Sequence, residues 1–393
     1  MSPAKFTQAF IVLLIGFTLA NTAHAQTETV LYNFTGGSDG GLPFSNLTSN
    51  GKGNFYGTAS EGGLKYGPNG YGTVFELSPN GAGGWNETTV YTFCSATNCA
   101  DGAFPVSDVI FDSAGNLYGT TYSGGTNENG VVFELSPKGK KWKEKVLYSF
   151  ASGSNQGRPQ ANLIMDSSGN LYGTVGVGVF ELTQSGGVWS EQIIYAPGGY
   201  AGLTMGSAGN IYGLSNTAIF ELSSNGKGGW NSTVLYTFST KGNTPIPVGS
   251  LALDKAGNLY GAIYGAPYGS GAHNQGKIFE LVNKKSKWTR KVLYNFGSVA
   301  GDGSNPNAGV VLDASGNVYG VTRYGGSSNS GTVFELVAPV GKGDYQEKIL
   351  TSFDGTNGST PYASLILDDS GNIYGTTTTG GSSNYGTVFE VTP

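Results

Sequence analysis

The sequence predicts an all-β protein that folds as a seven-bladed β-propeller with four-stranded blades. Three observations predict this fold: one cassette recurs seven times, each copy contains four short strand-like segments, and the composition suits strands and tight turns. The clearest copy spans residues 313–336 and reads DASGNVYGVTRYGGSSNSGTVFEL. It holds a tight turn, a strand around Val-Tyr-Gly, a glycine-rich loop and a strand around Val-Phe-Glu-Leu. Repeats with four strands per unit are typical of propellers.

The composition also favours repeated strands. The chain has 393 residues, of which 66 are Gly, 23 Tyr and 20 Phe, and only 12% are charged, whereas charged residues usually make up about 25% of a globular chain. Single cores stop growing near ~250–300 residues, so a chain of this length spreads its core over domains or repeats. Its apolar runs are short and bounded by turn-forming residues, which is typical of strands.

Four signatures recur in a fixed order. The first is an aromatic strand, such as LYSF at 147–150, and the second is an apolar strand ending in Asp, such as LIMD at 163–166. The third runs from Gly-Asn to Tyr-Gly, and its first glycines are Gly53, Gly115, Gly169, Gly209, Gly257, Gly316 and Gly371. The fourth ends in Phe-Glu-Leu or Phe-Glu-Val, with its phenylalanines at Phe75, Phe133, Phe180, Phe220, Phe279, Phe334 and Phe389.

The connections between these signatures predict the strand order within a blade. Asp-x-x-Gly-Asn is a tight turn, so the second and third signatures form a hairpin, and the glycine-rich loop leads on to the fourth. The link after the aromatic strand is longer and often carries Gly-x-x-Pro, as at 102–105. We interpret it as the crossover from the outermost strand of one blade to the innermost strand of the next. The N-terminal strand, 29–34, then completes the last blade, 362–391, and closes the ring.

The repeat resembles the GloVer tandem repeat of secreted bacterial proteins over nearly the whole chain after residue 25. The resemblance is carried by the cassette Gly-Asn-Leu-Tyr-Gly-Thr … Gly-Gly … Gly-Thr-Val-Phe-Glu-Leu-Ser-Pro. More distantly, Pro-x-x-x-Leu-x-x-Asp-x-x-Gly-Asn-x-Tyr is similar to the repeats of NHL-type and streptogramin-lyase-like propellers. The GloVer resemblance implies export and brings no known reaction with it. Streptogramin-lyase-like propellers rely on histidines, and His273 is the one histidine that follows the leader.

The N-terminal residues 1–25 have the layout of a secretory signal peptide. Lys5 supplies the positive charge, residues 9–20 form an apolar run, and residues 23–25 read Ala-His-Ala, an A-x-A cleavage site. The alternative is a membrane anchor, but the apolar run is too short to span a bilayer comfortably. We therefore expect removal of the leader at Ala25, a propeller domain over 26–393 with no transmembrane segment, a periplasmic or extracellular location, and a monomer.

Charge and residue chemistry exclude several kinds of site. The net charge is −5 with an isoelectric point near 5.1, and basic residues are sparse, so nucleic-acid binding is not expected. The seven glutamates of Phe-Glu-Leu are expected to be hydrogen-bonded between blades, and the turn aspartates, such as Asp313, to cap turns. Neither pattern predicts a metal or a cofactor. Cys94 and Cys99 are expected to form a loop-bracing disulfide, as is typical of exported chains.

The candidate site is positional, because the crossovers and the glycine-rich loops emerge on the same face of the ring. This face is expected to gather Asp39, Asp101, Tyr122, Arg158, Tyr264, Tyr268, His273, Arg323 and Tyr324. Aromatic rings with a few polar groups suit a polysaccharide or a peptide segment of a protein; alternatively, these are ordinary loop residues.

Three functions remain open from the sequence. The first is a secreted, non-catalytic binding or cell-surface interaction module for a polysaccharide or protein. The second is a lyase or hydrolase that uses the central cavity of the same face. The third is a scaffold that binds no small ligand. An enzyme needs convergent acid, base or metal groups, and the inner-strand positions are mostly Ala, Gly, Ser, Asn and Leu, with Asp108 as the exception.

Overall fold

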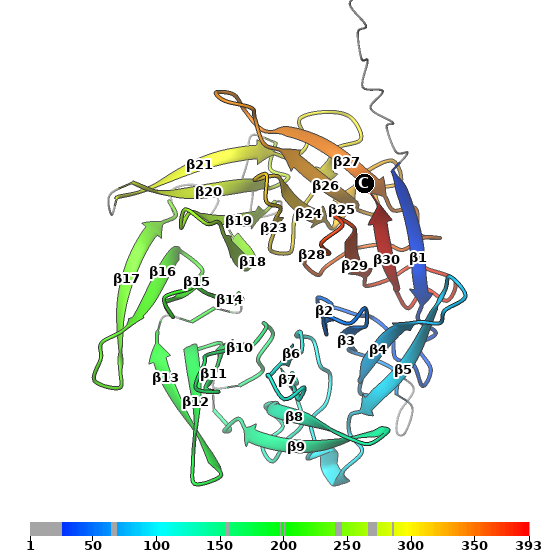
Figure 1. Cartoon of the computed structure of the whole chain (residues 1–393), viewed down its shortest axis with the longest axis vertical. Helices are drawn as coiled ribbons and strands as arrows, with labels where there is room; N and C mark the ends of the chain where they lie inside the picture. The colour runs from blue at the N-terminus through cyan, green and yellow to red at the C-terminus, as the bar shows by residue number, and fades with distance from the viewer. Residues whose placement is uncertain are drawn as a thin grey trace, which may run out of the picture.

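A computed structural model describes residues 26–63, 69–153, 157–196, 198–199, 201–239, 246–265, 273–284 and 287–392. Seven four-stranded antiparallel sheets are arranged around a central axis (Figure 1). In six of the sheets the strands follow one another in chain order from the axis outward, and in the seventh the first strand of the chain is added at the outer edge. Each crossover leads to the innermost strand of the next blade. The predicted seven-bladed β-propeller is confirmed.

The first four blades have their strands in the same order. Blade 1 comprises β2 (Thr48–Ser49), β3 (Phe55–Ala59), β4 (Thr73–Pro79) and β5 (Trp85–Thr92). Blade 2 comprises β6 (Ile110–Phe111), β7 (Leu117–Thr120), β8 (Val131–Lys138) and β9 (Lys141–Ser149), and is preceded by a single-turn 3-10 segment, η1 (Thr97–Cys99). Blade 3 comprises β10 (Ile164–Met165), β11 (Leu171–Val175), β12 (Gly178–Ser185) and β13 (Val188–Tyr195), and blade 4 comprises β14 (Leu203–Met205), β15 (Ile211–Leu214), β16 (Ala218–Ser224) and β17 (Trp230–Thr237).

The last three blades complete the ring. Blade 5 comprises β18 (Ile246–Leu253), β19 (Leu259–Tyr264), β20 (Lys277–Lys284) and β21 (Lys287–Asn295). Blade 6 comprises β23 (Val311–Leu312), β24 (Val318–Thr322), β26 (Thr332–Val337) and β27 (Gln346–Ser352), and the short pair β22 (Gly303–Ser304) and β25 (Tyr324–Gly325) lies beside it. Blade 7 comprises β28 (Ile366–Leu367), β29 (Ile373–Thr377), β30 (Thr387–Thr392) and β1 (Thr27–Asn33).

The two ends of the propeller meet in blade 7, where β1 is the outermost strand (Figure 1). It pairs antiparallel with β30, from Thr27 opposite Thr392 to Asn33 opposite Thr387. The predicted closure of the last blade by the N-terminal strand is therefore confirmed. Most of the innermost strands are shorter than the sequence predicts, because only two residues of segments such as LIMD at 163–166 pair with the next strand; in blade 5 the innermost strand, β18, has eight residues.

Large aromatic side chains hold neighbouring blades together. The phenylalanine that follows the outermost strand of one blade packs edge-on against the Phe of Phe-Glu-Leu in the next, with ring centroids 5.0–6.0 Å apart in six of the seven interfaces. Between blades 3 and 4, Tyr195 takes this role against Phe220 at 4.3 Å. The contact between Phe34 and Phe75, at 5.1 Å, joins blade 7 to blade 1. The hydrophobic core is thus a ring of similar interfaces.

The glutamates of Phe-Glu-Leu bond within a blade rather than between blades, which corrects the expectation from the sequence. Each is the cross-strand neighbour of the Tyr of Tyr-Gly, as Glu335 is of Tyr319. The Tyr319 hydroxyl lies 3.0 Å from Glu335 Oε1 and 3.3 Å from Asp313 Oδ2. Asp313 also accepts backbone hydrogen bonds from Ser315 and Asn317, at 2.8 and 2.9 Å. These carboxylates therefore organise turns and strands.

Replacing Gly320 by alanine is expected to destabilise the propeller by about 1–3 kcal/mol, the usual cost of overpacking a core. A Cβ at this position would lie 2.6 Å from Cζ of the buried Phe334 ring. The midpoint of thermal unfolding measures the effect. The double variant Gly320→Ala/Phe334→Leu should recover part of the loss, because leucine is shorter than phenylalanine; a Gly320→Ala protein of unchanged stability would contradict this packing.

Candidate functional site: a central cavity

The crossovers reach the axis in one repeated conformation. The residue before the crossover proline has a left-handed backbone, with φ of 51–60°, at Leu42, Phe104, Arg158, Asn305 and Thr360. Its N–H donates to a loop carbonyl of the preceding blade, as Arg158 does to Asn129 at 2.7 Å and Asn305 to Gln275 at 2.8 Å. Non-glycine residues rarely adopt this conformation. The chain after each proline is thereby directed along the axis.

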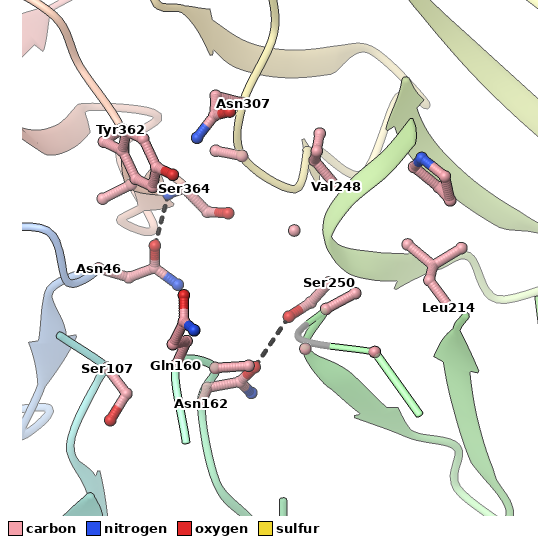
Figure 2. Close-up of a pocket in the computed structure, with 18 of the residues that line it drawn as sticks. Asn46, Ser107, Gln160, Asn162, Leu214, Val248, Ser250, Asn307, Tyr362 and Ser364 are labelled. Atoms are coloured by element: carbon pink, nitrogen blue, oxygen red, sulfur yellow. Dashed lines mark hydrogen bonds between the residues drawn. The ribbon is translucent and has the colours of Figure 1, made fainter. Parts of the chain in front are cut away.

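A cavity of about 300 Å³ opens between these segments, and all seven blades contribute to its lining (Figure 2). The upper tier consists of the residues that directly follow the crossover prolines: Phe44, Val106, Gln160, Val248, Asn307 and Tyr362. The lower tier comprises Asn46, Asp108, Asn162, Ser250 and Ser364, which lie two positions further along their segments, together with Gly202 of blade 4. The side chains of the upper tier vary in size and polarity, whereas those of the lower tier are small and, apart from the glycine, polar.

Hydrogen bonds join the lower tier across blades. The backbone N–H and the side-chain amide of Asn46 donate to the two carboxylate oxygens of Asp108, at 2.7 and 2.6 Å. The side-chain oxygen of Asn46, Oδ1, accepts from the Ser364 backbone N–H. On another side, Ser250 Oγ donates to Asn162 Oδ1 at 2.9 Å. Figure 2 shows the bonds to Ser364 and from Ser250. These bonds fix the lower tier in one arrangement.

Blade 4 has a glycine, Gly202, at the point where the bond between Ser250 and Asn162 passes. A Cβ on Gly202 would lie 2.0 Å from Ser250 Oγ and 2.2 Å from Asn162 Oδ1, so only glycine permits the bond between blades 3 and 5. The short turn of blade 4, with Leu214 and Asn216, then lines the cavity itself. A short repeat in the sequence thus contributes its own turn to the cavity lining.

Three lining amides are free to bind a ligand. Within the described part of the chain, the side chains of Gln160, Asn216 and Asn307 make no hydrogen bond, and Gln160 and Asn216 are exposed. Each amide carries two donors and an acceptor. Beside them, the Phe44 and Tyr362 rings meet edge to face at 5.2 Å and supply an aromatic wall. The cavity therefore combines unsatisfied amides with an aromatic surface.

Asp108 is the one carboxylic acid among the described lining residues. Burial raises its pKa to about 6, although the hydrogen bonds from Asn46 favour the ionised form and oppose the shift. Around neutral pH this group is an acceptor that is already occupied by Asn46. No lysine, arginine, histidine or cysteine is found among the described lining residues.

Asp39 and Asp101, two of the predicted site residues, lie away from the cavity lining. Both are buried and hold the loop that follows an outermost strand. Asp101 accepts hydrogen bonds from the Tyr91 hydroxyl at 2.7 Å and the Ser95 N–H at 2.8 Å, and Asp39 has the same relation to Tyr32 at 3.1 Å. A strand Tyr followed by a crossover Asp, 7 residues later at Tyr32 and 10 later at Tyr91, is the signal for this structural role.

The predicted arginines and tyrosines form two pairs. Arg158 lies over the Tyr122 ring at 5.4 Å, and Arg323 over the Tyr324 ring at 5.1 Å. Arg323 also lies 5.7 Å from the ring of the cavity residue Tyr362. Of the other predicted residues, Tyr264 ends β19 opposite the lining residue Ile246, His273 is exposed, and Tyr268 lies outside the described residues.

The sequence reasoning missed most of the cavity lining, including Phe44, Gln160, Asn307 and Tyr362. A usable signal was present, because these residues share one place in the repeat, directly after a proline, and differ in chemistry there. Elsewhere on the crossovers, Cys94 and Cys99 form a disulfide with their Cα atoms 3.9 Å apart. In the described residues, no three His, Cys, Asp or Glu side chains gather as a possible metal site.

Three comparisons place the chain among known proteins. A model of the Gloeobacter/Verrucomicrobia repeat matches residues 16–213, 86–263 and 190–393, which confirms the predicted resemblance to the GloVer repeat. Comparison with curated protein sequences finds no match. No helix in the described ranges is long and apolar enough to cross a membrane.

Solved propellers share the fold at low sequence identity. A catalytically inactive virginiamycin B lyase from Staphylococcus aureus with quinupristin, in which alanine replaces a histidine, is 16% identical with a TM-score of 0.59, and the match covers 94% of this chain and 99% of that one. An extracellular domain from B. thetaiotaomicron is 14% identical (TM-score 0.59; 94% and 42% covered). The WD40 propeller domain of Doa1 is also 14% identical (TM-score 0.55; 92% and 96% covered).

Proposed function

Because the chain belongs to the Gloeobacter/Verrucomicrobia repeat family, whose repeats here build a propeller with an axial cavity, we propose that it is a secreted, non-catalytic binding module. The observation that carries the proposal is the cavity lining. Free amides on Gln160, Asn216 and Asn307 line the same cavity as the aromatic wall of Phe44 and Tyr362. Amides that bond hydroxyl groups and rings that pack on apolar ring faces suit a sugar unit of a polysaccharide.

The proposed location is periplasmic or extracellular, after removal of residues 1–25, which lie outside the described residues. The leader-like sequence supports it, and so does the similarity in fold to an extracellular domain. A cavity of about 300 Å³ is at the small end of ligand sites, which range from roughly 300 to 1,000 Å³. It suits one or two sugar units at the end of a chain.

The double variant Gln160→Ala/Asn307→Ala is expected to bind about 5- to 150-fold more weakly to the polysaccharide that the protein selects from a glycan array. Each lost hydrogen bond costs about 0.5–1.5 kcal/mol, and 1.4 kcal/mol is a tenfold change. The matched control is Asn231→Ala, an exposed amide on the outer strand β17. Equal binding by the double variant and the control would exclude the cavity as the site, and an array without any hit would contradict glycan binding.

A lyase or hydrolase is the second candidate function, and Asp108 is the observation that favours it. A carboxyl group whose pKa is raised to about 6 by burial can exchange protons near neutral pH. This enzyme would lose its activity in Asp108→Asn, whereas a binding module would keep its affinity, because asparagine can still accept the hydrogen bond from the Asn46 N–H.

A further inference from the structure

The Arg323 guanidinium has no acidic partner in the described structure. The one ion pair formed by described residues joins Lys348 to Glu335, at 3.8 Å. Arg323 Nε is buried and makes no hydrogen bond there. The protein as a whole carries a net charge of −5, with more carboxylates than basic side chains, and yet none of the described carboxylates pairs with Arg323. An arginine that is held in place and left without an anion has free capacity to bind one.

Aromatic contacts connect this arginine to the cavity. The guanidinium carbon lies 5.1 Å from the Tyr324 ring centroid and 5.7 Å from that of Tyr362, both within the range of a cation–π interaction. Tyr362 in turn meets Phe44 at 5.2 Å, and both rings line the cavity. The Arg323 N–H donates to Asn305 O at 3.0 Å, which ties its backbone to the neighbouring crossover. Arg323 is therefore a fixed positive charge beside the cavity rim.

Arg158 repeats the arrangement on another blade. Its guanidinium lies 5.4 Å from the Tyr122 ring centroid, and Nη1 is 3.5 Å from the Tyr122 hydroxyl. Pro159 follows it, and Gln160 then lines the cavity. The side chain is exposed, and its backbone has a φ of 60°. Two arginines that are each supported by tyrosine thus stand next to the residues that line the cavity.

We infer that the ligand of the cavity is an acidic polysaccharide, whose sugar carboxylates are bound by Arg323 and, as a second contact, by Arg158. The inference rests on the proposed function, since it assigns a charge to the ligand of that same cavity. The amides, hydroxyls and aromatic rings of the lining would contact the sugar ring, and the two arginines at the rim would contact its carboxylate substituents, away from the lining carboxylate of Asp108, which is occupied by Asn46. A positively charged rim on a negatively charged protein also selects anionic ligands during encounter.

The test uses one polymer in two charge states. Polygalacturonate and its fully methyl-esterified form share their sugars, but only the first carries carboxylates. We expect the full chain to bind polygalacturonate at least ~10-fold more tightly than the ester, and to lose that preference as the salt concentration rises. Arg323→Gln should weaken binding to polygalacturonate about 10-fold and leave binding to the ester unchanged. Arg323→Lys should lie between the two, because it keeps the charge and loses the planar stack.

The controls separate this inference from the proposed function. Lys255→Gln removes an exposed positive charge from a turn of blade 5 and should change neither affinity. Equal affinity for the acidic and esterified polymers would overturn the inference and leave the binding module standing. A charge preference that survives in Arg323→Gln/Arg158→Gln, or selection of neutral dextran alone, would also overturn it. If no polysaccharide binds, neutral or acidic, both the inference and the proposed function fall.

Discussion

Replacing Phe34 by alanine is expected to lower the stability of the propeller by about 3–5 kcal/mol, as large-to-small substitutions of buried phenylalanine do. Phe34 is fully buried and follows β1, the strand that completes blade 7. Its ring meets Phe75 of blade 1 at 5.1 Å and Tyr32 of its own strand at 5.2 Å. The substitution therefore weakens the interface between blade 7 and blade 1, beside the strand that closes the ring.

Chemical denaturation of the protein measures this loss, because the midpoint shifts in proportion to the free energy of unfolding. Thr29→Ala is the matched control, since Thr29 lies on the same strand and is exposed. Deleting residues 26–35 should have a larger effect than Phe34→Ala, because it also leaves the outer edge of β30 unpaired. A deletion variant that unfolds at the same denaturant concentration as the intact chain would contradict closure of the ring by β1.

Most of the architecture could be predicted because every repeat obeys the same local rules. Glycine in Tyr-Gly recurs because a Cβ there would meet the Phe of the next strand, as Gly320 meets Phe334. The ring closure followed from counting: the chain begins with an outermost strand and ends with the strand inside it. Such features leave a periodic trace in the sequence, and the trace specifies both the strands and their order.

The candidate site was less predictable, because function depends on positions where the repeats differ. Arg323 and Tyr324 could be proposed from their place in a glycine-rich loop, and the structure puts Arg323 beside the cavity residue Tyr362. Asp39 could not be assigned correctly from its place alone. Its role depends on the Tyr32 hydroxyl and the Thr35 N–H, which lie 3.1 and 2.8 Å from its carboxylate only after the loop has folded.

The unfolding temperature is expected to fall as the pH rises from about 5 to about 8, because three glutamates at equivalent positions take up protons in the folded state. Glu87, Glu144 and Glu347 lie on the outermost strands of blades 1, 2 and 6. Burial raises the pKa of each to about 7, and the charge of an aspartate adds to the shift: Asp39, Asp101 and Asp302 respectively.

The pair formed by Asp302 and Glu347 shows why a proton is favoured there. Asp302 is only 7% exposed, and its Oδ2 accepts from the Tyr294 hydroxyl at 3.0 Å and the Gly297 N–H at 2.7 Å. Asp302 Oδ1 and Glu347 Oε1 are both buried and have no donor among the described residues. A proton on Glu347 would supply the missing donor. Deprotonation leaves two buried oxygens unpaired, which is costly.

The sign of the effect follows from the shifted pKa. In unfolded protein the pKa of these glutamates lies near the ordinary value of 4.5, and in folded protein it is about 7. Between these values the folded state binds more protons, so the stabilising contribution is complete below about 4.5 and is lost as the pH rises through 7. Turn aspartates such as Asp368 act in the opposite direction. Hydrogen bonds from Asn372 and Ser370 outweigh burial and lower the pKa of Asp368, so its contribution to stability is lost when a falling pH protonates it. Stability should therefore be greatest near pH 5.

The triple variant Glu87→Gln/Glu144→Gln/Glu347→Gln tests this assignment, since glutamine keeps a donor at every pH. In the intact chain, a loss of about 1 kcal/mol per pair should lower the unfolding temperature by roughly 4 °C between pH 5 and pH 8, because the unfolding entropy of a chain of this length is large. The variant should lose most of this slope and be more stable than the parent at pH 8. Asp344→Asn, which removes an exposed carboxylate, should keep the slope of the parent. If the triple variant kept that slope as well, the titration would belong to other groups, and the three blade interfaces would have to hold their carboxylates ionised.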